Sequence, residues 1–176
     1  MTARFIVLAA CSVLMPSAAL AQGRPIEIGF NSGIGVSFAG GSNAIEVAVP
    51  VQTVRVGFFV ADQISLEPAV GFTLVKPEDF DASYQLSAAL SGLYHLSASN
   101  ARAQPYVRAQ GQFLLAGAGG ESASQFGVGG GIGVKLPLVE RLAARVEASI
   151  GYRFENDDFV GVTTVAGLFG FSFFTR

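Results

Sequence analysis

The chain has 176 residues, of which 51% are hydrophobic and 14% charged, and its formal net charge is −2. The length fits a single domain, while the charged fraction lies well below the roughly one quarter that is typical of soluble domains. The negative charge excludes the basic face that nucleic-acid binding needs. After residue 21, no apolar run reaches the roughly 18 residues of a membrane-spanning helix.

Residues 1–21 have the three parts of a secretory signal peptide. Arg4 forms the positive region, residues 5–14 are apolar, and Ala19-Leu20-Ala21 is a small-x-small cleavage site. Cleavage after Ala21 would release the protein from its export signal. We therefore expect a mature domain at residues 22–176.

Cys11 is the single cysteine and lies within this segment. The sequence Leu8-Ala9-Ala10-Cys11 also fits a lipoprotein processing site, but cleavage there would leave the apolar stretch at 12–21 unexplained. We therefore expect ordinary signal cleavage and a mature chain with one histidine and no cysteine. Such a chain has no disulfide and no His/Cys zinc site, and we expect no metal and no cofactor.

Beyond the signal, apolar residues alternate with small or polar ones, as in half-buried β-strands. The first strand is predicted at 26–38, where even positions are apolar apart from Ser32, and a turn follows at 39–44. The second strand is predicted at 45–60, with its two halves out of phase. Pro50 and the Gln52-Thr53 pair indicate a β-bulge that shifts the register by one residue.

The remaining strands are separated by turns and loops of polar or small residues. In chain order we predict a turn at 61–63, a strand at 64–74, a loop at 76–82, a strand at 84–96, a turn at 98–104, a strand at 106–115, a small-residue loop at 116–124 and a strand at 126–136. A turn at 137–141 precedes the most regular strand, 142–154. An acidic loop at 155–158 leads to the last strand, 159–174.

These eight strands of about 11 to 16 residues exceed the usual five or six of soluble proteins and reach the roughly 9 to 11 that cross a bilayer. An even number lets both termini lie on the periplasmic side, with the turns at Asp62, Arg102 and Arg141. The pattern predicts an all-β fold, an eight-stranded antiparallel up-and-down transmembrane β-barrel. A soluble barrel such as a lipocalin is the alternative, but its outer coat would then consist mostly of Gly, Ala and Ser.

Charged residues of both signs fall on the small-residue face, which we expect to line the lumen. Because charges buried singly are costly, we expect them to pair. The predicted lumen charges are Glu27, Arg55, Glu67, Arg108, Lys135, Arg145, Glu147 and Arg153. The alternative for Arg108, Arg145 and Glu147 is a catalytic or ion-conducting cluster.

Aromatic residues gather near both sets of strand ends, as in the two girdles of membrane barrels. One set comprises Phe38, Phe72, Tyr84, Phe113, Phe126, Tyr152 and Phe154, and the other comprises Phe58, Tyr94, Tyr106, Phe171 and Phe173. Aromatics scattered through a core are the alternative. The chain has no Trp, which departs from a usual girdle.

Four segments, at 56–68, 104–107, 139–147 and 167–174, carry loose strand and turn motifs. Together they resemble the small OmpA/OmpX-type outer-membrane β-barrel domains of the porin-like superfamily. The closing segment resembles the insertion signal read by the barrel-assembly machinery, with Gly167, Phe169, Phe171 and Phe173 as its residues. Such chains commonly end on an aromatic residue, whereas Thr175 and Arg176 follow here. The resemblance implies a fold and a Gram-negative outer-membrane location, and no particular activity.

His95 and Ser97, with Asn100 nearby, resemble the His-x-Ser pair of lipid A 3-O-deacylases, which are eight-stranded barrels. A nucleophilic serine needs a base and an acid that orients that base. Where the deacylase pattern has a glutamate this chain has Ala109, and alternation puts His95 and Ser97 on the lumen face at the periplasmic end. We therefore expect no enzymatic activity.

Two further patterns have ordinary structural explanations. The glycine spacings at 127–133 are similar to those of nucleotide-binding loops, but the segment alternates as a strand and no helix follows. The acidic loops, with Glu78, Asp79 and Asp81 and with Glu155, Asp157 and Asp158, are expected to be solvated, with divalent-cation binding as the alternative.

The sequence thus predicts a non-enzymatic barrel, expected to be a monomer, with a structural or surface-interaction role in the cell envelope. A narrow pore for small solutes is the first alternative and a lipid A hydrolase the second. The expected partners are outer-membrane lipid and lipopolysaccharide, with the barrel-assembly machinery and periplasmic chaperones during biogenesis. No nucleic-acid partner is expected.

Overall fold

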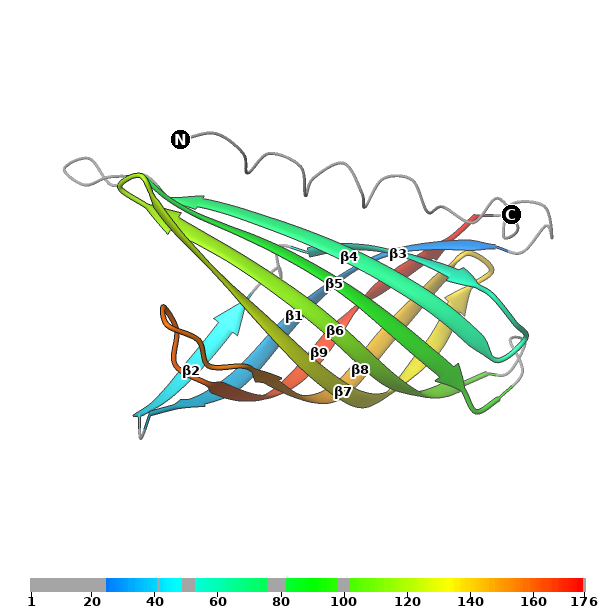
Figure 1. The fold of residues 1–176 in the computed structure, drawn as a ribbon. Helices are drawn as coiled ribbons and strands as arrows, with labels where there is room; N and C mark the ends of the chain where they lie inside the picture. Colours follow the sequence, from blue (N-terminus) through cyan, green and yellow to red (C-terminus); the bar gives the residue numbers. More distant parts are fainter. Residues whose placement is uncertain (1–24, 41, 49–52, 76–81, 98–101, 176) are drawn as a thin grey trace.

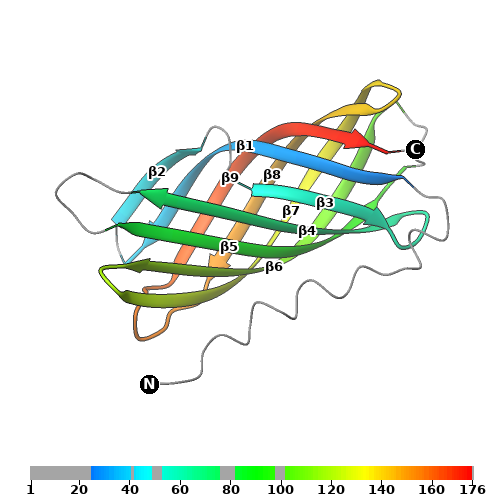
Figure 2. The ribbon, with the colours of Figure 1, turned by 90° about the horizontal axis from the view of Figure 1, so that it is seen from above.

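The computed structural model describes residues 25–40, 42–48, 53–75, 82–97 and 102–175. Its nine strand segments are β1 (Ile26–Ala39), β2 (Ser42–Ala48), β3 (Thr53–Phe59), β4 (Ile64–Val75), β5 (Ser83–His95), β6 (Gln104–Ala118), β7 (Glu121–Val139), β8 (Leu142–Arg153) and β9 (Val162–Phe174). All pairings are antiparallel, and β9 pairs with β1, so the sheet closes into a barrel (Figures 1 and 2). Within these ranges, no helix is long and apolar enough to cross a membrane. The predicted signal segment lies outside the described residues.

β2 and β3 are the two halves of the second predicted strand, because both pair with β1. Gly33 pairs with Ala48 of β2, and Phe30 pairs with Val54 of β3. From Gly33 to Phe30 is three residues on β1, whereas from Ala48 to Val54 is six residues on the strand that pairs with it. The register therefore shifts by three residues, whereas the prediction was a shift of one residue. An odd shift moves side chains to the opposite face, which accounts for the two phases. Because β2 and β3 together occupy the place of one strand in the wall, the predicted eight-stranded barrel is confirmed. Residues 49–52, where the bulge was predicted, lie outside the described part.

Three of the described connections are shorter than predicted, whereas the one between β8 and β9, at 154–161, is longer than the predicted loop at 155–158. β6 and β7 extend through most of 116–124, where a loop was expected, and Gly119 and Gly120 alone join them. These glycines have φ values of 59° and 89°, the left-handed conformation that two-residue hairpin turns require. The turns expected at 39–44 and 137–141 shorten likewise, because β2 begins at Ser42 and β7 runs to Val139. Small residues are typical of loops in soluble proteins, but in a narrow barrel they also suit the strands.

The two ends of the barrel differ. The C-terminus and the start of β1 lie at the same end as the turns at 61–63 and 140–141 (Figure 1). Backbone hydrogen bonds tie this C-terminal end together, since Thr175 N donates to Ile26 O at 2.8 Å and Phe174 N to Arg141 O at 3.0 Å. The opposite end, here called the loop end, carries the β6–β7 hairpin and the segment 154–161.

Alternate side chains point to opposite sides of the wall. On β8, Arg145 is 2% exposed and faces the lumen, whereas its neighbour Val146 is 51% exposed. The same apolar outer face recurs around the barrel, with Phe30, Val54, Val70, Leu90, Val107, Ile132, Ile150 and Phe169 all exposed. An apolar outside and a polar inside is the arrangement of a membrane barrel. The soluble-barrel alternative needs the reverse and is contradicted.

Most of the predicted girdle aromatics lie on the outer face. Phe38, Phe72, Phe126, Tyr152 and Phe154 are exposed toward the loop end, and Tyr94, Phe171 and Phe173 toward the C-terminal end. The prediction for Tyr106 is wrong, because its side chain is 1% exposed and lies inside the barrel. Tyr106 is in phase with Arg108 on β6, so alternation directs it to the lumen although it stands at a strand end.

Candidate functional site

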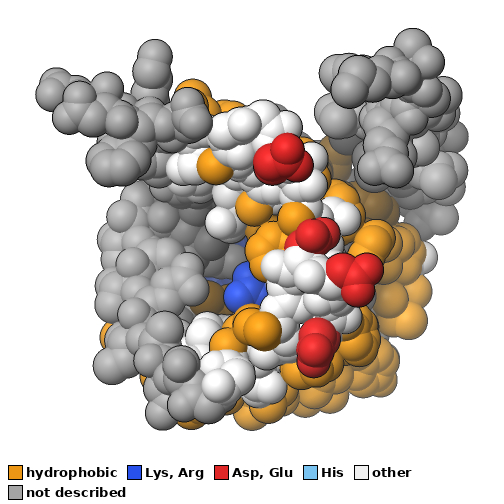
Figure 3. Space-filling model, turned by 60° about the vertical axis from the view of Figure 1, so that its left-hand side comes forward, with side chains coloured by type: hydrophobic (Ala, Val, Ile, Leu, Met, Phe, Trp, Pro, Cys, Tyr) orange, Lys and Arg blue, Asp and Glu red, His pale blue; other side chains and the backbone are white. Residues whose placement is uncertain are grey.

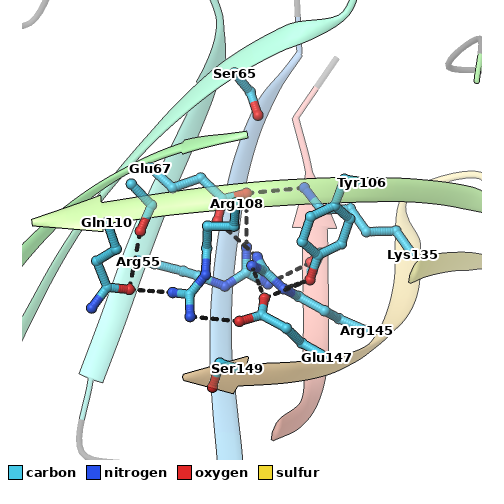
Figure 4. A network of polar contacts seen from close by, with 12 residues as sticks. Arg55, Ser65, Glu67, Tyr106, Arg108, Gln110, Lys135, Arg145, Glu147 and Ser149 are labelled. Carbon is cyan, nitrogen blue, oxygen red and sulfur yellow. Dashed lines mark hydrogen bonds and ion pairs between the residues drawn. The ribbon is translucent and has the colours of Figure 1, made fainter. Parts of the chain in front are cut away.

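Seven charged residues from six strand segments meet inside the barrel, toward the C-terminal end (Figure 4). They are Glu27 on β1, Arg55 on β3, Glu67 on β4, Arg108 on β6, Lys135 on β7, and Arg145 and Glu147 on β8, and we call them the lumen network. All are buried except Arg108, whose side chain is 13% exposed. Seven of the eight predicted lumen charges therefore lie together, and Arg153 lies apart from them.

Glu27 holds two cations from different walls. Its Oε1 lies 2.5 Å from Arg55 Nη1, and its Oε2 lies 2.5 Å from Lys135 Nζ. Arg55 also donates through Nη2 to the hydroxyl of Ser172 at 2.7 Å. Both carboxylate oxygens are thus engaged, as a buried carboxylate requires.

Glu67 is the second shared carboxylate. Its Oε1 accepts from Lys135 Nζ at 3.0 Å and lies 3.4 Å from Arg55 Nη1, while its Oε2 accepts from Arg145 Nη1 at 2.7 Å. Lys135 therefore bridges Glu27 and Glu67, and Arg55 touches the same two carboxylates. These alternating charges join β1, β3, β4, β7 and β8 in one set of contacts.

Glu147 anchors the other side of the lumen network. Its Oε2 accepts from Arg145 Nη2 at 2.8 Å and from the Tyr106 hydroxyl at 2.7 Å, and its Oε1 lies 2.5 Å from Arg108 Nη2. Arg145 Nε in turn donates to the Tyr106 hydroxyl at 2.6 Å, and its guanidinium lies 4.8 Å from the ring centre. Tyr106 thus belongs to the site. The signal that could have found it is the period-two phase that it shares with Arg108.

Glycines on the wall make room for these long side chains. A Cβ at Gly133 would overlap the Tyr106 hydroxyl and lie 2.8 Å from the Val146 carbonyl oxygen. A Cβ at Gly29 would likewise overlap the guanidinium of Arg55. The glycine run at 127–133 is a strand, as expected, and its glycines at Gly131 and Gly133 face the packed interior.

The lumen network carries four cations and three carboxylates, so one positive charge is in excess. Arg108 stands at the edge of the network and also donates to Gln110 Oε1. Arg153, farther toward the loop end, has no carboxylate within salt-bridge distance among the described residues and lines a space that adjoins the lumen network. The lumen is therefore positive where the network ends.

That space is a cavity of about 350 Å³ between the lumen network and the loop end. Its polar lining includes Asn31, Gln85, Gln110, Gln112, Gln125 and Arg153. In the view toward the loop end, the molecule is hollowed and a basic side chain is visible inside, with acidic side chains along one side of the opening (Figure 3). The lumen therefore has a packed, charged half toward the C-terminal end and a hollow, polar half toward the loop end.

His95 and Ser97 do not form a catalytic pair. His95 Nε2 lies 2.9 Å from the hydroxyl of Ser65, and its ring lies 5.0 Å from that of Phe59. The Ser97 hydroxyl instead donates to the Ala103 carbonyl at 3.1 Å. His95 Nδ1 is buried without a hydrogen-bond partner among the described residues, so no acid orients this histidine as a hydrolase would need. Asn100 lies outside the described residues.

The other predicted features can be placed more briefly. Gly167, Phe169, Phe171 and Phe173 lie on the exposed face of β9, and their role as an insertion signal stays a prediction. Glu155, Asp157 and Asp158 are exposed in the loop that follows β8, while the loop with Asp79 lies outside the described residues. In the described part of the chain, no group of three or more His, Cys, Asp or Glu residues is arranged to hold a metal ion.

No protein-family model and no curated protein sequence matches the chain. Among solved structures, the chain is similar to Neisserial surface protein A, with 14% identity, a TM-score of 0.63 and coverage of 84% of this chain and 96% of that one. The N-terminal β-barrel domain of OprF from Pseudomonas aeruginosa matches with 18% identity, coverages of 85% and 97% and a TM-score of 0.49. The attachment invasion locus protein Ail of Yersinia pestis matches with 12% identity, coverages of 86% and 99% and a TM-score of 0.48. At these identities, the first likeness establishes the fold.

Proposed function

We propose that this chain, which has the fold of the small outer-membrane β-barrels, is a non-enzymatic outer-membrane protein with a structural or surface-interaction role in the cell envelope. One observation carries the proposal: an apolar outer face surrounds a lumen whose buried groups are charged. Exposing the apolar outer face to water would cost free energy, and so would placing the charged groups of the lumen in contact with lipid. A lipid bilayer around a closed barrel satisfies both faces, and the predicted signal at 1–21 supplies the export route.

The lumen network favours a closed barrel over a pore. Lys135 and Arg145 extend across the interior to carboxylates on other walls, at distances of 2.5 to 3.0 Å. In an eight-stranded barrel the side chains are just large enough to fill the interior. The cavity toward the loop end is the observation in favour of the alternative, a narrow pore, but it ends at the lumen network.

The hydrolase alternative is weaker. The nearest partners of His95 and Ser97 are Ser65 and a backbone carbonyl, and neither supplies an acid. A lipid A hydrolase would also have to present its nucleophile to lipid, whereas His95 is buried inside the wall. A change in lipid A mass on expression of the protein would support the hydrolase against our proposal.

The proposed surroundings follow from the location. The outer face would contact outer-membrane lipid and lipopolysaccharide, and assembly would use periplasmic chaperones and the barrel-assembly machinery, which would read Gly167, Phe169, Phe171 and Phe173. A monomer is proposed because the sheet closes on itself, so that the described strands leave no full-length edge for a partner.

Two measurements test the proposal. Separation of inner and outer membranes on a density gradient should place the protein in the outer-membrane fraction, and a variant without residues 1–21 should stay in the cytoplasm. In planar bilayers, the purified barrel should show no single-channel steps. A Glu67→Ala/Arg145→Ala variant, which lacks the contact between these two residues in the lumen network, is measured for comparison. Steady conductance by the unaltered protein would replace our proposal with the pore.

A further inference from the structure

The polar half of the lumen has a defined direction of hydrogen bonding. Arg108 can only donate, so the amide of Gln110 must turn its oxygen toward it. Gln110 Nε2 then donates to Gln112 Oε1 at 3.3 Å. This order leaves Gln112 Nε2, a donor, at the loop-end side of the chain, with no partner among the described residues. The lumen network thereby fixes which end of Gln112 faces the cavity.

The aliphatic stem of Arg153 lies beside this donor. A Cβ at Gly127 would lie 2.7 Å from Gln112 Nε2 and 3.0 Å from Arg153 Cγ. The missing side chain at Gly127 therefore lets Gln112 and Arg153 approach the same patch of wall. Arg153 lines the cavity, and no carboxylate of the described residues lies within salt-bridge distance of it. Its charge is therefore available to a ligand.

The cavity offers almost no competing negative charge. The single carboxylate in its lining is that of Glu67, whose two oxygens are already held by Lys135 and Arg145. Neutral polar groups are present as well, because Gln85 and Ser149 line the cavity and neither of them is buried. Gln125 is buried and donates through Nε2 to the carbonyls of Phe154 and Val160. Asn31 Oδ1 is buried in the lining without a partner in the described part of the chain.

We propose that this cavity binds a small hydroxylated acid, a molecule of monosaccharide size that carries a carboxylate or phosphate. Its oxyanion lies against Arg153 and Gln112, and its hydroxyl groups contact the side chains of Gln85 and Ser149 in the lining. The volume of about 350 Å³ falls within the range of small-molecule pockets. Planar guanidinium and amide donors are the groups that proteins use for such oxyanions.

The acidic rim sets the approach to the cavity. Glu121 and Asp158 line a second, more open hollow that shares Gln85 with the cavity. Both are exposed, so salt screens their repulsion beyond roughly 8 Å at physiological ionic strength. The rim is therefore negative, but its repulsion of an anionic ligand acts only at short range.

The experiment is calorimetric titration of the folded full barrel in a zwitterionic detergent, with glucuronate, glucose 6-phosphate and neutral glucose as probes. Saturable binding of a charged sugar, about tenfold or more tighter than that of glucose, is expected from one charge-assisted hydrogen-bond pair. The tighter of the two charged probes identifies carboxylate or phosphate as the preferred oxyanion. Equal affinity for the charged and neutral sugars, or no saturation with any, overturns the proposal.

Variants locate the site. Arg153→Gln should weaken binding by about tenfold or more, and Arg153→Lys should weaken it less because the charge remains. Gln112→Glu should abolish binding, since its carboxylate would occupy Arg153 and repel the ligand. Arg141→Gln is the matched control, because Arg141 is an exposed arginine at the C-terminal end, and its affinity should not change.

Two outcomes count against the site. Equal losses with Arg153→Gln and Arg141→Gln would mean that binding reports total charge, and unchanged affinity in Gln112→Glu would place the ligand elsewhere. Circular dichroism checks that each variant is folded, and the two positions keep the test valid if one variant fails to fold. The titration needs only a folded barrel, so its failure leaves the proposed membrane role standing.

Discussion

The guanidinium of Arg145 on β8 reaches across the lumen to the carboxylate of Glu67 on β4, with Nη1 2.7 Å from Oε2. In the order of strands around the wall, β5, β6 and β7 separate the two on one side, and β9, β1 and β3 on the other. Arg145 and Glu67 therefore stand on opposite walls. A contact between opposite walls resists changes in the cross-section of the barrel, which hydrogen bonds between adjacent strands do not fix.

Removal of Glu147 should destabilise the barrel strongly. Glu147→Ala leaves Arg108, Arg145 and the Tyr106 hydroxyl without their shared acceptor, and breaking a buried pair in this way costs about 3–5 kcal/mol of unfolding free energy. Urea titration of the barrel in lipid vesicles measures the loss. Glu155→Ala, in the exposed loop, is the control and should change stability by less than about 0.5 kcal/mol.

The same pair gives a double-mutant cycle. Because Arg145 and Glu147 contact each other directly, the Glu147→Ala/Arg145→Ala variant should lose less stability than the two single variants summed. Additive losses would mean that the two residues act independently. The lumen would then be better described as hydrated, and the pore alternative would gain support.

A methyl group at Gly133 should be poorly tolerated. Its Cβ would overlap the Tyr106 hydroxyl and press on the Val146 carbonyl, and overpacking of this kind typically costs about 1–3 kcal/mol. Gly111 is the matched control, since a Cβ there meets nothing within 4 Å. Equal unfolding free energies for Gly133→Ala and Gly111→Ala would contradict the close packing of Tyr106 against β7.

The direction of the side chains predicts how arginine substitutions behave. Val146→Arg puts a charge on the lipid face and should cost about 2–4 kcal/mol if the residue lies near the bilayer midplane. Ser149 faces the lumen cavity, so Ser149→Arg should still allow insertion into vesicles. If the Val146→Arg barrel stayed folded and soluble without detergent, the membrane assignment itself would fail.

The sequence predicted correctly those features that depend on a local pattern, such as which side of the wall a side chain faces. Period two separates Val146 from Arg145, and it does so on every strand because a barrel wall has two different sides. It carried no information on which cations meet which carboxylates, since Lys135 and Glu27 are 108 residues apart and meet only after the sheet closes. At 116–124 the small residues led to the prediction of a loop, whereas most of them belong to strands β6 and β7. Tyr106 was assigned to the outer aromatic girdle because it stands near a strand end, whereas its side chain lies in the lumen.

The orientation in the membrane is the last prediction. If the C-terminal end is periplasmic, the turn with Glu140 faces the periplasm and the loop with Asp157 faces the cell surface. Both residues are exposed, and Cys11, the single native cysteine, lies in the segment that we expect to be removed. On whole cells, an impermeant maleimide should therefore label Asp157→Cys and leave Glu140→Cys unlabelled, while both should react once the outer membrane is permeabilised. Labelling of Glu140→Cys alone on intact cells would invert the topology, and the cavity would then open to the periplasm instead of the medium.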